Sequence, residues 1–273
     1  MRAKATYITK AIGRRLYWAP SDLARRLRGE AEMVPPRGLS FVGTSDFEET
    51  GREFLGHFVE LGQLEPEDRV LDIGCGIGRM AIPLTGYLEG GSYEGFDVGK
   101  EMISWCQRHI TKRFPAFHFT WSPIYNQKYN PFGTVSAAEF HFPYEDDSFD
   151  FALATSLFTH LTTSDAEHYL RELGRVLRPQ ATALLTFFLI TPESQAEIAA
   201  GRAEFAFEHR IPGAVTTDPR QPEEAVAFAL EDLRAMLDRA KLEVVEPVHR
   251  GTWANAPQAP SFQDIVVVRA RGS

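Results

Sequence analysis

Residues 69–79 read Arg69-Val70-Leu71-Asp72-Ile73-Gly74-Cys75-Gly76-Ile77-Gly78-Arg79, and this stretch decides the fold. Its first half is rich in apolar and β-branched residues, which is typical of a buried strand. Three glycines then alternate with other residues, and the missing Cβ atoms let the backbone turn sharply and let a ligand come close to the main chain. A helix expected over residues 77–88 would offer its unpaired N–H groups to that ligand. The stretch therefore predicts a strand, a ligand-binding turn and a helix.

The spacing of these glycines separates two kinds of turn. Gly74, Gly76 and Gly78 follow the pattern G-x-G-x-G, whereas a dinucleotide-binding turn with the pattern G-x-G-x-x-G would need a glycine where this chain has Arg79. About twenty residues after the turn, residues 92–98 indicate a second strand that ends in an acid, Asp97. An acid at this distance is placed to bind a pair of ribose hydroxyls.

Two motifs in this region resemble those of the class I S-adenosylmethionine-dependent methyltransferases. Residues 70–78, V-L-D-I-G-C-G-I-G, are similar to the first motif of that family, and residues 95–98, G-F-D-V, to the second. Residues 142–150, F-P-Y-E-D-D-S-F-D, and 173–179, L-G-R-V-L-R-P, resemble two further family segments. The second of these departs from the family pattern, because Gln180-Ala181 stands where two glycines are usual. The resemblance covers roughly residues 65–190.

The resemblance implies S-adenosylmethionine as methyl donor and S-adenosylhomocysteine as product. The residues that it implies for cofactor binding are Asp72, Gly74, Cys75, Gly76, Gly78, Asp97, Val98, Met102, Glu139, Phe140 and Thr155. Two of them are open to another interpretation. Met102 equally suits the hydrophobic core. The acid that relatives use beside the adenine aligns nearer Ala138 than Glu139.

Strands and helices of similar length alternate along the middle of the chain. Strands are expected over residues 69–73, 92–97, 117–121, 149–155 and 182–190, and helices over 47–63, 77–88, 99–112, 164–177 and 224–240. A closing antiparallel pair is expected over 242–248 and 262–268. The pattern predicts an α/β fold, a Rossmann-like doubly wound sheet of seven strands that is mostly parallel, with an antiparallel last strand and helices on both faces.

We predict two parts, an N-terminal helical arm or lid over residues 1–64 and a methyltransferase domain over 65–273. Insertions in the domain are expected near 121–147 and near 191–223, and the second does not resemble a regular sheet element. Residues 1–29 are basic and predict one or two helices, broken at Pro20 and capped by Ser21 or Asp22. A lid on the domain is the favoured interpretation of this arm. The alternative is peripheral contact with an anionic membrane or with a polyanionic substrate.

The prediction of the methyl acceptor depends on few residues. His160 follows the fourth expected strand, where ligands bind in doubly wound sheets, and a neutral histidine can remove a proton from a hydroxyl. His160 is therefore the candidate catalytic base, with His141 and His209 in reserve, although a structural role for His160 remains open. Aromatic and amide side chains in 121–147 suit a sugar or another polar small molecule. We expect O-methylation of a sugar or secondary metabolite.

Other functions stay open at this point. The alternatives are an N- or C-methyltransferase, a non-catalytic cofactor-binding regulator, and a nicotinamide oxidoreductase, against which Arg79 speaks. Asp264 is expected to anchor the turn at residues 251–253 rather than to act in catalysis. We expect no metal site, because no H-x-x-x-H, C-x-x-C or D-x-D run occurs.

Composition limits the class of protein. The 273 residues include 44% hydrophobic and 24% charged residues, an ordinary globular balance, and the formal net charge of -8 argues against a nucleic-acid partner. Two cysteines, Cys75 and Cys106, suit a reducing compartment. No apolar run is long enough for a transmembrane segment, and the start lacks the apolar core of a signal peptide. We expect a cytoplasmic protein, whose oligomeric state the sequence leaves open.

Overall fold

The computed structural model describes residues 2–27, 33–39 and 46–272. Seven strands form one sheet in the order β10-β11-β5-β4-β1-β2-β3. Their bounds are β1 Arg69–Ile73, β2 Ser92–Asp97, β3 Phe117–Trp121, β4 Phe149–Ala154, β5 Leu177–Phe187, β10 Leu242–His249 and β11 Asp264–Ala270. The pairs β1–β2, β2–β3 and β4–β5 are parallel, whereas β11 runs antiparallel to both β10 and β5. The predicted Rossmann-like sheet with an antiparallel last strand is confirmed.

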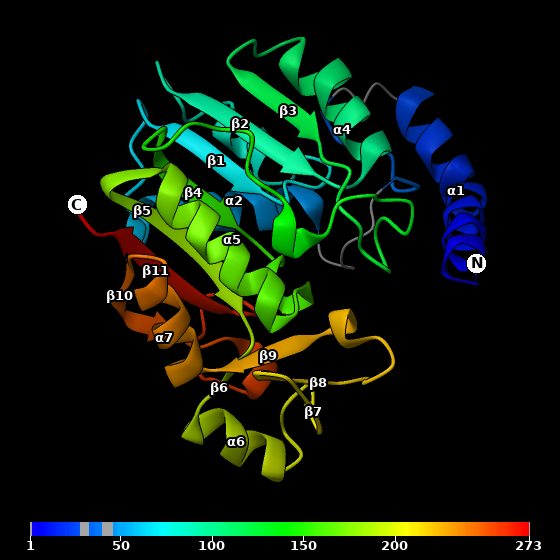
Figure 1. The fold of residues 1–273 in the computed structure, drawn as a ribbon. Helices are drawn as coiled ribbons and strands as arrows, with labels where there is room; N and C mark the ends of the chain where they lie inside the picture. The colour runs from blue at the N-terminus through cyan, green and yellow to red at the C-terminus, as the bar shows by residue number, and fades with distance from the viewer. Residues whose placement is uncertain (1, 28–32, 40–45, 273) are drawn as a thin grey trace. The chain divides into compact units, whose positions relative to one another are not determined.

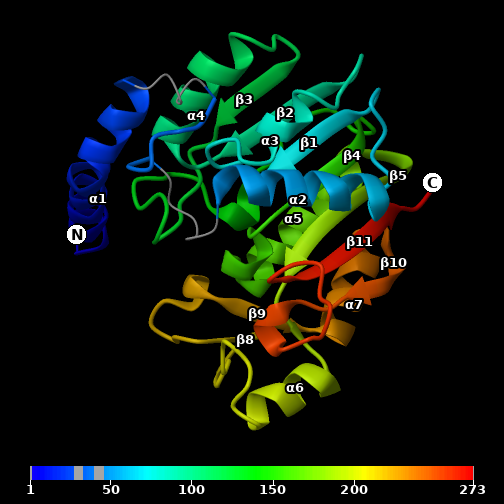
Figure 2. The same ribbon diagram turned by 180° about the vertical axis from the view of Figure 1, so that it is seen from behind.

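The chain divides into two compact units, Met1–Val135 and Ser136–Ser273, which are described separately. The described residues of the first unit form β1, β2 and β3 and five helical segments. These segments are α1 Arg2–Leu27, α2 Phe47–Glu60, α3 Ala81–Leu84, α4 Lys100–Cys106 and the π-helical turn η1 Gln107–Thr111. Within this unit α2 packs against α3, and Figures 1 and 2 show these elements from opposite directions. The division into an arm, 1–64, and a domain, 65–273, stays a prediction.

Two expectations about the helices of the first unit are wrong. The predicted break at Pro20 does not occur, and α1 is one helix that runs through the proline. A proline removes a single N–H from the helix, and the Ser21 hydroxyl donates a hydrogen bond of 3.0 Å to the carbonyl of Trp18 beside it. Of the helix expected over 77–88, only the four residues of α3 are α-helical, and they include Pro83. The turn before α3, rather than a long helix, therefore presents N–H groups to a ligand.

The second unit holds β4, β5, β10 and β11 together with three helices. These helices are α5 Thr163–Val176, α6 Pro192–Ala199 and α7 Leu230–Arg239. The residue Thr162 is the N-cap of α5, and its hydroxyl donates to the Asp165 carboxylate over 2.6 Å.

A second, smaller sheet in this unit was not predicted. Its order is β6-β9-β8-β7, with β6 Leu189–Ile190, β7 His209–Ile211, β8 Ala214–Thr216 and β9 Val226–Ala229. The expectation of no regular sheet element over 191–223 is wrong, because β7 and β8 lie there, preceded by the helix α6. The single helix expected over 224–240 is also wrong. Its first part is β9, whose Val226, Ala227 and Phe228 are fully buried, and only the remainder is α7.

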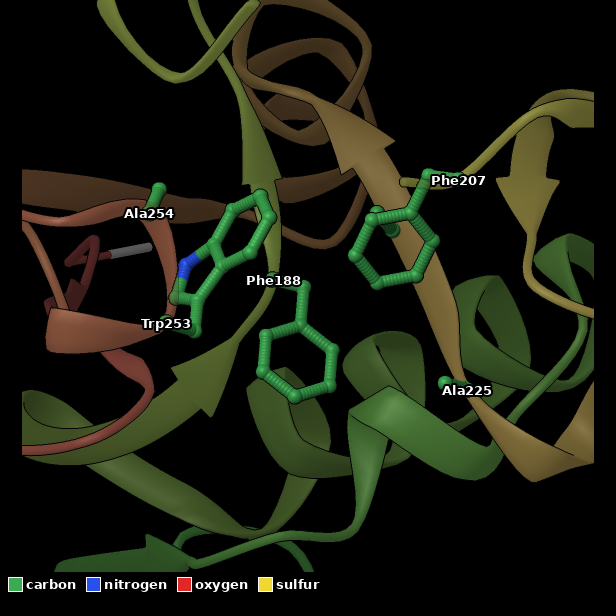
Figure 3. Packing of buried hydrophobic residues seen from close by; sticks show 6 residues of the cluster. Phe188, Phe207, Ala225, Trp253 and Ala254 are labelled. Carbon is green, nitrogen blue, oxygen red and sulfur yellow. The ribbon is translucent and has the colours of Figure 1, made fainter. Parts of the chain in front are cut away.

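An aromatic cluster packs between the second sheet and the segment that precedes β11. Its buried members are Phe188, Phe207, Ala225, Ala227, Trp253 and Ala254 (Figure 3). The Asp264 carboxylate lies next to this cluster and accepts hydrogen bonds from the N–H groups of Gly251 and Leu189, both over 2.7 Å, and from the Trp253 indole over 2.8 Å. The predicted anchoring role of Asp264 is thus confirmed.

Candidate functional site

The glycine turn after β1 has the backbone that its sequence predicts. Gly74, Gly76 and Gly78 have φ angles of 80°, 55° and 81°, a region that favours glycine. A Cβ on Gly76 would meet nothing within 4 Å, so the main chain there borders open space. A Cβ on Gly78 would lie 2.7 Å from the Ile110 side chain. Gly76 is therefore placed for close approach by a ligand, whereas Gly78 is needed for packing.

Asp97 joins the two loops that follow β1 and β2. One carboxylate oxygen accepts the N–H of Gly76 over 3.0 Å and the other accepts the N–H of Gly99 over 2.6 Å. Burial raises the pKa of the Asp97 carboxyl, and the hydrogen bonds from Gly99 and Gly76 oppose that rise. Each oxygen retains acceptor capacity, so the carboxylate can bind two further hydroxyl donors.

Asp72 lies beneath the turn with 1% of its surface exposed. One of its carboxylate oxygens accepts a hydrogen bond of 2.6 Å from the Tyr93 hydroxyl, a partner that was not predicted. Among the described residues the other oxygen has no hydrogen-bond partner. Burial raises the pKa of the Asp72 carboxyl to about 7, although the Tyr93 hydrogen bond acts in the opposite direction.

The raised pKa makes stability depend on pH. The folded protein holds the Asp72 proton more tightly than the unfolded chain, whose carboxyl has the ordinary pKa of 3.8. The resulting stability is present below about pH 4 and is lost as the pH rises towards 7, by up to about 4 kcal/mol. We expect Asp72→Asn to reduce this decline in urea unfolding curves recorded between pH 5 and pH 8. An unchanged slope in the variant would show that other groups cause the decline.

Of the other residues predicted to bind the cofactor in the first unit, Cys75 and Met102 are buried, and Val98 is bonded through its main chain. Cys75 is buried, and its N–H donates to the Phe96 carbonyl over 3.1 Å. Met102 is also buried, and its methyl group would lie 2.1 Å from a Cβ on Gly99, so it packs under that loop. The carbonyl of Val98 accepts a hydrogen bond of 3.1 Å from the indole of Trp121, a half-exposed residue at the end of β3.

In the second unit, Glu139 ends a short 3-10 turn, Ala137–Glu139, and Phe140 follows it in an extended conformation. The Glu139 side chain is exposed. The carbonyl of Phe140 lies 2.9 Å from Nε2 of His168 on α5, which fixes the main chain that follows the turn.

A polar cluster follows β4 in the second unit, and of this region only the neighbouring Thr155 was predicted as a site residue. Ser156 has a left-handed backbone, with φ 56°, and its N–H donates to the Thr186 hydroxyl over 2.7 Å. The hydroxyls of Ser156 and Thr186 both donate to the Gln263 side-chain carbonyl, over 3.2 and 2.6 Å. The Gln263 amide in turn lies 3.4 Å from the Thr159 hydroxyl. The two polar residues Gln263-Asp264 in an apolar strand were the available signal.

His160 lies in the second unit on a 3-10 turn, Phe158–His160. Its ring nitrogen Nδ1 is 2.8 Å from the main-chain carbonyl of Glu223. A carbonyl oxygen can only accept, so Nδ1 carries the proton and the lone pair of the neutral ring is on Nε2. This tautomer is the one that can accept a proton at Nε2. Of the reserve histidines, His141 pairs with Glu172 over 3.0 Å and His209 is exposed on β7.

Neither a metal cluster nor a membrane-spanning helix occurs in the part of the chain that the structure describes. Over these ranges, no group of three or more His, Cys, Asp or Glu side chains is arranged to hold a metal ion. Among the described helices, none combines the length and the apolar character needed to cross a bilayer.

Comparison with known families agrees with the turn geometry. Residues 71–185 match the family model described as a methyltransferase domain. The chain carries a class I methyltransferase domain. It is 32% identical over 201 residues to phthiotriol/phenolphthiotriol dimycocerosates methyltransferase 1 of Mycobacterium ulcerans, which covers 68% of this chain and 63% of the relative. It is 29% identical over 116 residues to sterol 24-C-methyltransferase of Schizosaccharomyces pombe, over 42% of this chain and 26% of the relative.

Solved structures share the fold of this methyltransferase domain at low sequence identity. A protein of Pyrococcus horikoshii superposes with a TM-score of 0.57 at 14% identity, over 89% of this chain and 99% of the other. The [4+2]-cyclase SpnF superposes with a TM-score of 0.54 at 17% identity, over 86% of each chain. Because the second of these is named as a cyclase, the fold alone does not establish methyl transfer.

Proposed function

We propose that this protein transfers a methyl group from S-adenosylmethionine to a hydroxyl of a small-molecule acceptor. The observation that carries the proposal is the arrangement of Asp97 beside the glycine turn. Its carboxylate is held by the N–H groups of Gly76 and Gly99 at the end of β2, inside a segment that matches a methyltransferase domain.

The groups present in the first unit fit such a cofactor. The unpartnered buried oxygen of Asp72 suits a cationic or hydroxyl donor, and the open space beside Gly76 suits a ligand in contact with the main chain. Asp97 would bind the ribose hydroxyls. We also assign contacts with the cofactor in this unit to Gly74, Cys75, Gly78, Val98 and Met102. In the second unit the assigned contacts are those of Glu139, Phe140 and Thr155.

The chain's own chemistry at the acceptor is assigned to His160. S-adenosylmethionine, when bound, supplies a methyl carbon activated by the neighbouring positive sulfur. The lone pair at Nε2 would accept the hydroxyl proton, while the Glu223 carbonyl holds the ring through Nδ1. Two nearby apolar residues, Phe158 and Leu161, are buried and help to fix the position of this turn.

The acceptor is proposed as a sugar or secondary metabolite, and the relatives add a more apolar class. The mycobacterial relatives are named for phthiotriol and phenolphthiotriol dimycocerosates, and the fission-yeast relative for a sterol. Since this chain spans 63% of the Mycobacterium ulcerans relative, the whole reaction remains a proposal. One alternative is methyl transfer to a nitrogen or carbon atom. The other is a regulatory protein that binds the cofactor without turnover.

Two measurements test the proposal in sequence. Thermal unfolding with S-adenosylhomocysteine or NADH should show a concentration-dependent rise in Tm for the first ligand, since ligands that bind the folded state stabilise it. Stabilisation by NADH alone would contradict the cofactor assignment. The protein is then incubated with methyl-labelled S-adenosylmethionine and a panel of sugars, phenols, sterols and long-chain diols. We expect the labelled methyl group to appear on a hydroxyl oxygen of at least one of these compounds. Stabilisation by S-adenosylhomocysteine without label transfer to any of them would favour the regulatory alternative.

A further inference from the structure

The helix α1 has one side that packs against the first unit. Tyr7, Arg14, Trp18 and Ser21 are partly buried and share one face of the helix. The Tyr7 ring meets the Phe132 ring edge-on with centroids 6.2 Å apart, and the Arg37 guanidinium lies 5.1 Å from the Trp18 ring. This face therefore already has its partners within the unit.

A different side of α1 carries apolar side chains that face solvent. Ile8, Ile12, Leu16 and Leu23 recur at helical spacing, which places them on one stripe. Their exposed fractions are 47%, 53%, 71% and 58%. Large aliphatic side chains normally gain free energy by burial, and a contiguous exposed row of them marks an interaction surface.

Charge identifies what this surface would contact. Residues 1–28 carry eight Lys and Arg against one acid, Asp22, in a chain whose formal net charge is -8. Of the described basic residues, Lys4 and Lys10 are exposed, and Arg15 pairs with Glu101 at the start of α4. A second copy of α1 would bring like charges together, whereas an anionic lipid surface attracts them.

We propose that α1 is an interfacial helix that docks the protein onto an anionic lipid bilayer, with Ile8, Ile12, Leu16 and Leu23 inserted among the acyl chains. The helix combines an exposed apolar stripe with an excess of basic residues, and its many charged residues make it too polar to cross a bilayer, as is typical of interfacial helices. It would therefore lie along the surface. The proposal concerns location and does not depend on the reaction that the domain catalyses.

Docking through this stripe leaves the contacts of the packed face intact. The Arg15–Glu101 pair joins α1 to the helix that follows Asp97, and Tyr7 joins it to the loop after β3. The Asp22 carboxylate accepts the N–H groups of Arg37 and Gly38 over 2.9 and 3.1 Å. The bilayer would thus lie close to the cofactor-side loops of the first unit.

Cosedimentation of the full-length protein with lipid vesicles tests this proposal. Vesicles of phosphatidylcholine with about 30% phosphatidylglycerol should bind the protein at about 50 mM salt, and binding should fall at least tenfold at about 500 mM salt. The double variant Ile12→Gln/Leu16→Gln removes apolar area without changing charge, and it should bind at least tenfold more weakly. Tyr17→Gln is the matched control, since Tyr17 is 75% exposed but lies off the stripe.

Each outcome decides the proposal. Loss of binding in the double variant but not in the control supports docking, provided that circular dichroism shows the same helix content in both. No binding of the wild type to anionic vesicles at low salt overturns it. Equal binding of wild type and double variant overturns it as well. A dimer in light scattering that the double variant abolishes, without vesicle binding, would assign the stripe to a second copy.

Discussion

Replacing Asp97 with alanine is expected to lower the affinity for S-adenosylhomocysteine by about a hundredfold or more. The carboxylate would bind two ribose hydroxyls, and each charge-assisted hydrogen bond is worth ~1.5–3 kcal/mol. It also accepts the N–H groups of Gly76 and Gly99, so its loss leaves two loop amides without their acceptor. Titration calorimetry with the purified variant measures the effect.

Two controls separate ligand binding from general damage to Asp97's surroundings. Glu101→Gln removes another acid nearby, an exposed residue of α4 that pairs with Arg15, and should retain wild-type affinity. Asp97→Asn keeps one oxygen acceptor and should fall between wild type and alanine. An Asp97→Ala protein that unfolds as the wild type does and binds within twofold of it would remove Asp97 from the cofactor site.

Replacing His160 with glutamine is expected to lower kcat by roughly 10²–10⁴ once an acceptor is found, with little change in cofactor affinity. The glutamine amide can still donate to the Glu223 carbonyl, but it has no basic nitrogen. Steady-state kinetics should show the loss in kcat rather than in KM.

The choice of substitution distinguishes a base from a structural residue. If His160 only holds the Glu223 loop, His160→Gln should restore most of the activity that His160→Ala loses. If it is the base, both variants should be similarly slow. His118→Ala changes an exposed histidine on β3 and serves as the control that should keep full activity. Near-normal kcat in both His160 variants would leave O-methylation without an assigned base.

The central sheet was predictable because its strands have simple patterns. The apolar run at 69–73 and the acid-ended run at 92–97 gave the correct bounds of β1 and β2. The glycine turn and Asp97 could also be placed from sequence, since only glycine adopts the observed φ angles easily. These features depend on local residues, which is why a single sequence contains them.

Features that depend on long-range packing were missed. β9 has a Val-Ala-Phe-Ala sequence that suits a helix equally well, and only its pairing with β6 and β8 makes it a strand. The hydrogen bond from Tyr93 to Asp72 crosses 21 positions, and the Gln263 bonds to Thr186 and Ser156 cross 77 and 107. No local pattern contains such pairs. By contrast, Pro-Gly at 212–213 was an overlooked signal for the β7–β8 turn.

The late position of Asp264 in the chain has a consequence for synthesis on the ribosome. The Leu189 N–H emerges 75 residues before the carboxylate that accepts it, and Trp253, which packs on Phe188, also emerges late. Until then Phe188 and its aromatic neighbours in the nascent second unit are not packed against Trp253. We therefore expect chains that stall between residues 189 and 264 to expose apolar surface and to aggregate more readily than complete chains.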